Sequence, residues 1–136
     1  MRVSFKVPFV RGKGRVRFVR ATGATYTPDR TAEAMEAIRM AYVAAGGLKA
    51  PRGAEVEVHV TTIRPLPKTA PKRVEEEPDI HRPDVDNIGK LCLDALNGTA
   101  WHDDEQVTTL LVSKCPRMRG VDPATYVWVR WGEGDE

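Results

Sequence analysis

The segment spanning residues 84–97 constrains the fold of this chain more than any other part of the sequence. Its apolar residues recur at helical spacing and form one stripe: Ile88, Leu91, Cys92, Ala95 and Leu96. Polar residues form a second row: Asp86, Lys90, Asp94 and Asn97. Pro83 precedes the segment and Gly98 follows it, as is typical of the two ends of a helix. The segment therefore predicts a short helix with one buried face and one polar face.

Two further segments have clear periodic patterns. Residues 54–63 alternate between apolar and polar side chains, which predicts a half-buried strand. Residues 27–29 read Thr-Pro-Asp, a typical helix start, and the glycine pair at residues 46–47 is a typical helix end. Apolar residues recur at helical spacing between them, so a second helix is predicted there.

The remaining segments suggest four short strands. Residues 3–10 and 16–21 read as two strands joined by a basic, glycine-containing turn, and residues 107–114 and 125–131 as two more. The predicted order is β-β-α-β-α-β-β, an α/β (α+β) fold with a small mixed β-sheet and two main helices. We expect one domain over residues 1–136, in which the proline-rich residues 64–83 form a long mobile loop.

The overall composition excludes several classes of protein. With 41% hydrophobic and 29% charged residues the chain resembles ordinary globular proteins, and it has no apolar run long enough to span a membrane. Its start has no signal-peptide character, so a cytoplasmic protein is expected. Cys92 and Cys115 form no metal-binding pattern and are expected to be reduced structural thiols.

The net charge of +2 conceals an uneven distribution. Residues 1–20 contain seven Lys and Arg residues and no acid, whereas residues 75–105 contain ten acids against Arg82 and Lys90. A basic arm beside an acidic centre fits an enzyme that holds a polyanion with one part and cuts it with another. Ordinary surface charge would give the same distribution.

Carboxylates gather at the start of the helix and in the turn that follows it. Asp84 and Asp86 flank the helix start, where one reading is simply an N-cap and an acid that stabilises the helix dipole. Asp103 and Asp104 lie in a turn that could fold back on the helix start, although Asp also suits turns in general. Clustered carboxylates need a cation, and Mg²⁺ at such a site usually serves phosphate chemistry. The spacing does not fit an EF-hand, whose twelfth position would be Ala95.

Lys90 follows Asp86 by four residues on the predicted helix. It could form an ordinary salt bridge with Asp86, or it could reach a phosphate held by a metal on that carboxylate.

At these residues the sequence resembles the RusA family of Holliday-junction resolvases, endonucleases of phages and prophages. The matching text runs from Arg82-Pro83-Asp84-Val85-Asp86-Asn87-Ile88 and Lys90 through Leu93-Asp94-Ala95-Leu96-Asn97-Gly98 and Trp101 to Asp103-Asp104-Glu105-Gln106-Val107 and Val112-Ser113-Lys114. The chain lacks the Pro-Pro-Ser-type start of one branch and resembles another branch in its Gly12-Lys13-Gly14-Arg15 and Tyr26-Thr27-Pro28.

The resemblance implies a homodimer that binds four-way DNA junctions, requires Mg²⁺ (or Mn²⁺) and no organic cofactor, and nicks two opposed strands symmetrically. It maps metal ligands onto Asp84, Asp86 and Asp104, with Asp103 adjacent, and a functional lysine onto Lys90. Asn87 would orient a ligand or a metal-bound water, Asp94 would support Lys90, and Trp101 would be a hydrophobic cover. The residues expected to contact DNA are Lys13, Arg15, Arg17, Lys68, Lys72, Arg73, Arg82 and Lys114.

Two other functions would use the same residues. One is a Mg²⁺-dependent nuclease of flaps or other branched DNA, and the other is a junction-binding protein without catalysis. The full set of acids argues against the second alternative, and comparing cleavage of junction, duplex, fork and flap DNA would decide the first.

Overall fold

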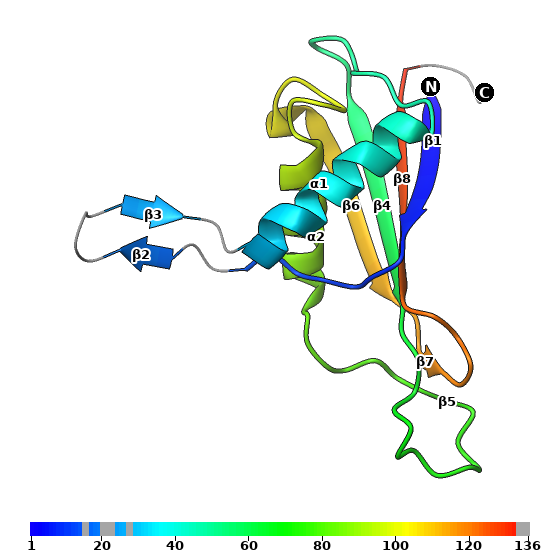
Figure 1. Cartoon of the computed structure of the whole chain (residues 1–136). Coiled ribbons are helices and arrows are strands. Elements are labelled where there is room, and N and C mark those ends of the chain that lie inside the picture. The colour runs from blue at the N-terminus through cyan, green and yellow to red at the C-terminus, as the bar shows by residue number, and fades with distance from the viewer. Residues whose placement is uncertain (15–16, 20–23, 27–28, 133–136) are drawn as a thin grey trace.

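The computed structural model describes residues 1–14, 17–19, 24–26 and 29–132. Figure 1 shows the order of the elements along the chain: β1 (Arg2–Val7), β2 (Arg17–Val19), β3 (Ala24–Tyr26), α1 (Asp29–Ala44), β4 (Val56–Ile63), β5 (Glu76–Glu77), α2 (Val85–Leu96), the 3-10 turn η1 (Asp104–Gln106), β6 (Val107–Lys114), β7 (Arg117–Met118) and β8 (Ala124–Trp131). The predicted fold class, a small mixed sheet with two main helices, is confirmed.

The four long strands form one sheet in the order β1-β8-β4-β6. β4 runs parallel to β6 and antiparallel to β8, and β8 runs antiparallel to β1. The valines of β4 are buried, as the alternation predicts. Among the described strands, β6 pairs with β4 alone, so β6 forms one edge of the sheet.

Both helices pack on one face of this sheet (Figure 1), α1 against β1 and α2 against β6. The core between the two layers contains Ile38 and Tyr42 of α1 and Ile88, Leu91 and Leu96 of α2. The buried Tyr42 hydroxyl donates to the Leu48 carbonyl at 2.5 Å, and burial raises its pKa far above the ordinary value. Cys92 is buried beside these residues, and burial raises its pKa to about 12, as expected for an unreactive structural thiol.

The first strand does not pair with the second, so the predicted turn over residues 11–15 joins no hairpin. β1 pairs with the last strand, β8, and β2 pairs with β3, a strand that the sequence did not predict. Residues 11–14 instead lie against α2, where the Lys13 N–H donates to the Asn87 carbonyl at 3.0 Å. The predicted helix start at Thr27 and Pro28 lies outside the described residues.

The segment expected to be a long loop, residues 64–83, is tied to the rest of the fold. Its short strand β5 pairs with β7, and Leu66 is buried. The Arg119 guanidinium donates to the carbonyls of Pro71 and Val74, at 2.9 and 2.7 Å. A proline-rich composition does not reveal such contacts, because their partners come from a distant part of the sequence.

The connection after α2 sets the geometry of the candidate site. Asn97 ends the helix, and Gly98 turns the chain with a φ of 83°, which a residue with a Cβ rarely adopts. β6 then runs back along α2, so that Lys114 at its end lies 3.0 Å from the Pro83 carbonyl. The turn containing Asp103 and Asp104 therefore lies at the C-terminal end of α2, and Asp84 and Asp86 lie at its N-terminal end.

In the described part of the chain, neither helix has the length and apolar character needed to cross a membrane.

Candidate active site

Asp84 occupies the N-cap position of α2, but its carboxylate does not cap the helix. Its backbone is extended, with φ −74° and ψ 156°, and its side chain makes no capping hydrogen bond. Only its carbonyl takes part in the helix start, accepting from the Ile88 N–H at 3.0 Å. The carboxylate is exposed and available for another ligand. A purely structural capping role for this side chain is therefore excluded by the geometry.

Asp86 and Lys90 lie next to each other on the outer face of α2. The Lys90 ammonium is 3.8 Å from the Asp86 carboxylate, and the two side chains are 60% and 65% exposed. Exposed pairs at this spacing contribute at most about 0.5 kcal/mol, so a ligand could separate them at little cost. The salt bridge foreseen from the spacing is present, and it leaves both groups accessible.

Asp94 has a different partner from the one expected. Its carboxylate lies 2.6 Å from the Lys13 ammonium, and Lys90 approaches Asp86 instead. This contact follows from the position of residues 11–14 against α2, which the sequence did not predict. Lys13, expected to contact DNA, is thus engaged in an ion pair within the chain, with its side chain 37% exposed.

At the opposite end of α2, the carboxylates are used for local structure. Asp103 caps the 3-10 turn by accepting from the Glu105 N–H at 3.1 Å, and the Gln106 side chain completes a capping box. Asp104 accepts from the indole N–H of Trp101 at 2.8 Å. Trp101 is fully buried, as expected for a hydrophobic cover, but it also fixes Asp104 in place. No sequence pattern predicts this contact.

The two pairs of carboxylates do not meet within one chain. A helix of twelve residues is about 18 Å long, and the pairs lie at its two ends. Accordingly, the described residues contain no group of three His, Cys, Asp or Glu side chains that could hold a metal ion. The expectation that the Asp103-Asp104 turn folds back on the helix start was wrong for a single chain. The reason is that β6 has to run the length of α2 before the chain returns.

Two basic residues act on His102, which directly precedes Asp103. The pKa of the neighbouring His102 is lowered by burial and by the positive charges of Arg52 and Lys49. These residues were not singled out from the sequence, because their proximity depends on the packing of residues 49–54 beside the turn.

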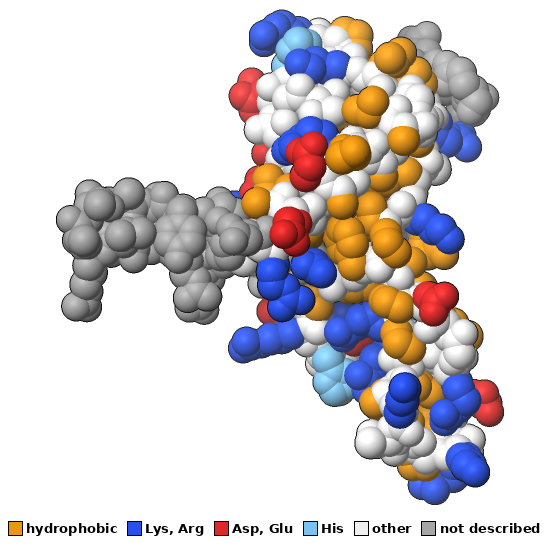
Figure 2. All heavy atoms as spheres, viewed as in Figure 1, with side chains coloured by type: hydrophobic (Ala, Val, Ile, Leu, Met, Phe, Trp, Pro, Cys, Tyr) orange, Lys and Arg blue, Asp and Glu red, His pale blue; other side chains and the backbone are white. Residues whose placement is uncertain are grey.

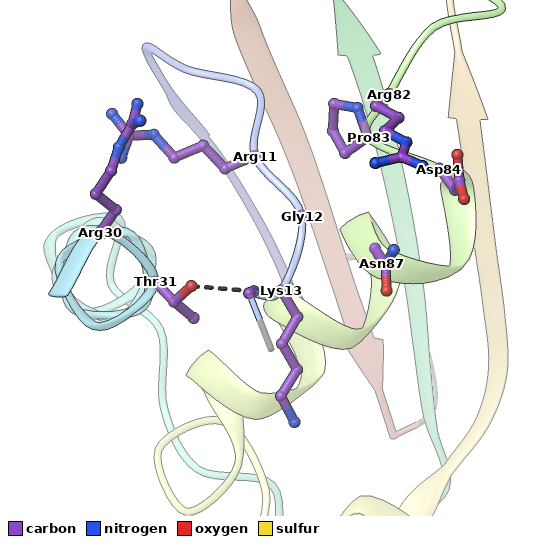
Figure 3. A pocket seen from close by; sticks show the side chains of 10 residues that line it. Arg11, Gly12, Lys13, Arg30, Thr31, Arg82, Pro83, Asp84 and Asn87 are labelled. Atoms are coloured by element: carbon purple, nitrogen blue, oxygen red, sulfur yellow. Dashed lines mark hydrogen bonds between the residues drawn. The ribbon is translucent and has the colours of Figure 1, made fainter. Parts of the chain in front are cut away.

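A cavity of about 740 Å³ opens beside Asp84 (Figure 3). It is lined by Arg11, Gly12, Lys13, Gly14, Arg30, Thr31, Arg82, Pro83, Asp84 and Asn87. Arg82 was expected to contact DNA, and its place beside Asp84 is consistent with that role. Arg11 and Arg30 were not predicted individually. Arg11 belongs to the basic stretch that the sequence shows near the N-terminus. Arg30 lies in the predicted helix start, where the sequence pattern indicates the helix boundary and not a ligand contact.

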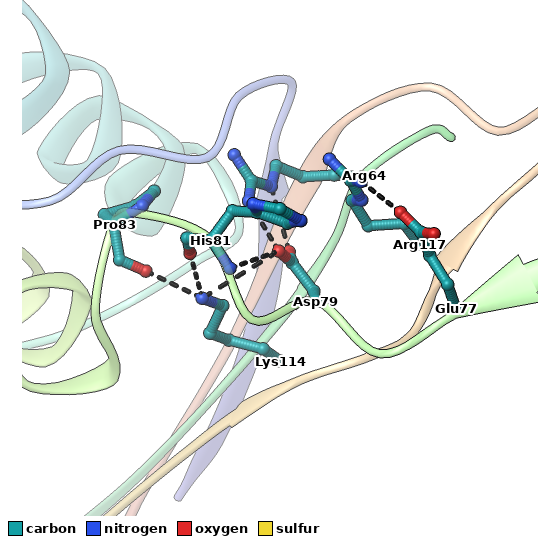
Figure 4. Close-up of polar contacts among 7 residues, drawn as sticks. All are labelled: Arg64, Glu77, Asp79, His81, Pro83, Lys114 and Arg117. Carbon is teal, nitrogen blue, oxygen red and sulfur yellow. Dashed lines mark hydrogen bonds and ion pairs between the residues drawn. The ribbon is translucent and has the colours of Figure 1, made fainter. Parts of the chain in front are cut away.

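A buried ion-pair network holds the segment that leads into α2 (Figure 4). The Arg64 guanidinium donates to both oxygens of Asp79, at 2.9 and 2.5 Å, and the Lys114 ammonium lies 3.9 Å from the same carboxylate. Burial alone raises the pKa of Asp79, but the hydrogen bonds and charge of Arg64, together with Lys114 and the His81 N–H, outweigh it and hold the pKa below its ordinary value.

Lys114, expected to contact DNA, is engaged in contacts within the chain. Its ammonium donates to the carbonyls of His81 and Pro83, and its side chain is only 11% exposed. β6 ends beside the segment that leads into α2, so its last residue is held against that segment.

Three of the other residues expected to contact DNA lie together on the surface. Lys68, Lys72 and Arg73 are exposed on residues 64–83, and Figure 2 shows Lys and Arg side chains gathered over that part of the molecule. Arg15 lies outside the described residues, and only the backbone of Arg17 is described.

Comparison with known families identifies one match. The sequence model of the family described as "Endodeoxyribonuclease RusA" matches residues 8–130, which include both helices and both pairs of carboxylates. No curated protein matches the chain.

Proposed function

Because the chain belongs to the RusA family of endodeoxyribonucleases, which resolve Holliday junctions, we propose that it does so as a Mg²⁺-dependent homodimer that nicks two opposed strands. The observation that carries the proposal is the state of Asp84. Its carboxylate makes no capping hydrogen bond, and its neighbours are a second exposed carboxylate and a basic cavity.

Asp84 and Asp86 suit Mg²⁺, which proteins usually bind through one or two carboxylates together with water and substrate phosphates. Mn²⁺ prefers the same oxygen ligands and could replace it. Bound there, the ion would supply an activated water and neutralise the charge that develops on the phosphate. Lys90 faces the same exposed side of α2 and would place a positive charge near the phosphate to be cut. Asn87 lines the cavity and would orient a ligand or a metal-bound water.

The third carboxylate, Asp104, would come from a second copy of the chain. β6 forms an open edge of the sheet and carries Leu110 and Leu111, which are 38% and 52% exposed. Antiparallel pairing of β6 with its copy about a two-fold axis would continue the sheet and cover part of this apolar surface. It would also set the two α2 helices antiparallel, so that the N-terminal end of one faces the C-terminal end of the other.

This arrangement joins the separated carboxylates. Asp84 and Asp86 of one chain would face Asp104 of the partner subunit, with Asp103 beside it, and each dimer would contain two such sites. A four-way junction has two-fold symmetry, so two sites related by a two-fold axis suit paired symmetric nicks. Lys and Arg contacts to phosphates would make binding strongly dependent on salt.

The test uses Asp86→Asn and a set of synthetic DNAs. The substitution should abolish nicking of a fixed junction in Mg²⁺ and leave junction binding intact or tighter, because it removes a ligand and one negative charge. Asp122→Asn, an exposed residue of the turn before β8, makes the same chemical change away from both ends of α2 and should cut normally. Wild-type cleavage of junction, duplex, fork and flap DNA at equal rates would contradict junction specificity, and normal cutting by Asp86→Asn would contradict the site.

A further inference from the structure

Three arginines surround the cavity beside Asp84 without a carboxylate of their own. Arg11 lies in the segment after β1, and Arg30 lies in the first turn of α1. Arg82 lies three residues before the first residue of α2. Figure 3 shows the guanidinium ends of Arg11 and Arg30 pointing toward each other, with Arg82 on the opposite wall. Within the described residues, no ion pair joins any of the three to an acid. Like charges brought together in this way favour an anion between them.

The wall that carries Arg11 is fixed to both helices. The Gly14 N–H donates to the Thr31 hydroxyl of α1 at 3.0 Å, and the Lys13 N–H donates to the Asn87 carbonyl of α2 at 3.0 Å. Gly12 fits closely between them, because a Cβ there would lie 2.9 Å from the Cβ atoms of both Asn87 and Pro83. Arg11 is further held over the Phe9 ring, with 5.3 Å between its guanidinium carbon and the ring centre. The cavity is thus a built feature of the fold and not a gap between independent side chains.

We propose that this cavity binds a phosphate group of the DNA strand next to the phosphate that is cut, with Arg11 and Arg30 as its main ligands. The inference rests on the proposed function, since it needs a DNA strand at the carboxylates. Asp84 lines the cavity and also belongs to the proposed metal-binding pair, so an anion held here lies beside the reacting phosphate. Arginine is suited to this role because its planar fork can donate two hydrogen bonds to one phosphate.

The geometry also assigns the two arginines a function different from that of the carboxylates. They would fix the position of the strand along the site, which sets where the cut falls, and they would not take part in breaking the bond. Their loss should therefore weaken binding and raise KM, with a smaller effect on kcat.

The first experiment measures junction binding without divalent metal over a range of salt concentrations. Arg11→Gln and Arg30→Gln should each weaken binding about tenfold at low salt and reduce the slope of log K against log[salt] by about one. Lys6→Gln, an exposed residue of β1 that does not line the cavity, removes the same charge and should leave the slope unchanged. Circular dichroism and thermal unfolding establish that each variant is folded.

The second experiment identifies the phosphate. Junctions carrying one neutral methylphosphonate at successive positions around the cut are compared on the wild-type chain and on Arg30→Gln. At one position the wild-type chain should lose affinity while the variant loses none further. Nicked junctions with a 5′-phosphate or a 5′-hydroxyl test the other source, and a difference seen only there would assign the cavity to the terminal phosphate of the product.

The proposal would be overturned if both arginine variants showed the salt slope of the wild-type chain. It would also be overturned if, at every methylphosphonate position, the loss of affinity simply added to the loss caused by Arg30→Gln. Those results leave wild-type cleavage of the junction intact, so they are distinct from failure of the proposed function. If the wild-type chain itself neither binds nor cuts a junction, both proposals fall together.

Discussion

The two ends of α2 carry the same type of residue in opposite structural situations. At the N-terminal end, the carboxylates of Asp84 and Asp86 are exposed, and neither is needed to complete the helix. At the C-terminal end, Asp103 caps a turn and Asp104 accepts from a buried indole. Removing a carboxylate at the first end should change cleavage with little effect on stability, whereas removal at the second should also lower stability.

The same contrast extends to how each end is held in place. The segment before α2 is held by a buried network of charges that consists of Asp79, Arg64 and Lys114. The turn after α2 is positioned by Trp101 in the core and by Gln106, whose amide donates to the carbonyls of Pro51 and Ala54. The carboxylates of Asp103 and Asp104 therefore accept hydrogen bonds that hold their own turn in place. The segment that carries Asp84 is instead held by other residues.

The largest effect is expected when the two ends are disabled in different chains. Asp84→Asn and Asp104→Asn should each lower cleavage about a thousandfold or more, since loss of a metal ligand removes several kcal/mol of transition-state stabilisation. A heterodimer of the two variants, purified through two different tags, should regain nicking at about half the wild-type rate per dimer, because one of its two composite sites is intact. It should not make paired cuts. If each site were built within one chain, both sites of this heterodimer would be defective and it would stay inactive.

The next largest effect concerns the network below the N-terminal end. Asp79→Asn should lower the free energy of unfolding by about 3 kcal/mol at neutral pH, because it leaves Arg64 and Lys114 without their buried counter-charge. The folded pKa of Asp79 lies below its ordinary value of 3.8, so this stability is present above pH 3.8 and is lost as the pH falls through the lowered folded value. Denaturant titrations at pH 7 and at intervals below pH 4 should show the variant and the wild-type chain converging in acid. An equal difference at every pH would contradict the charge-based explanation.

Sequence patterns were sufficient for the elements that form the layers of the fold. The alternation in β4 and the apolar stripe of α2 are repeated signals, and both elements lie within two residues of their predicted bounds. The predicted strand at residues 107–114 agrees with β6. These elements are specified by burial of one face, which the sequence records directly.

The pairings and contacts between distant segments could not be predicted in the same way. Whether β1 pairs with the next strand or with the last one depends on the whole sheet, and a short basic segment after β1 fits either arrangement. The candidate carboxylates were identified by type and order, but their separation depends on the direction of β6 relative to α2. Arg64 and Asp79 were missed because each is an ordinary charged residue until the fold brings them together.

A smaller effect is expected from Asp103, which distinguishes the two ends by stability. Asp103→Ala should lower the free energy of unfolding by about 1 kcal/mol, the usual cost of losing an N-cap side chain. Asp84→Ala, made at the N-cap of α2, should cost only a few tenths of a kcal/mol, since its side chain makes no capping hydrogen bond. Both values come from urea unfolding of the two variants under the same conditions. Equal losses would mean that the two carboxylates do not differ in the way their hydrogen bonds indicate.

The smallest effect on stability is expected at Lys90. Its ion pair with Asp86 is long, at 3.8 Å, and both side chains are more than half exposed, so Lys90→Gln should change the free energy of unfolding by less than about 0.5 kcal/mol. Cleavage of a junction should nevertheless fall, because the same substitution removes the positive charge proposed to face the phosphate. Raising the salt concentration should reduce the small stability difference further, since exposed pairs are screened.

Arg39→Gln on α1 provides the contrast, because that guanidinium donates to the Ala95 carbonyl at 3.2 Å and joins the two helices. It should cost more stability than Lys90→Gln and leave kcat unchanged. A Lys90 variant that cuts at the wild-type rate would reduce the residue to a surface salt bridge, and the N-terminal end of α2 would then act through its carboxylates alone.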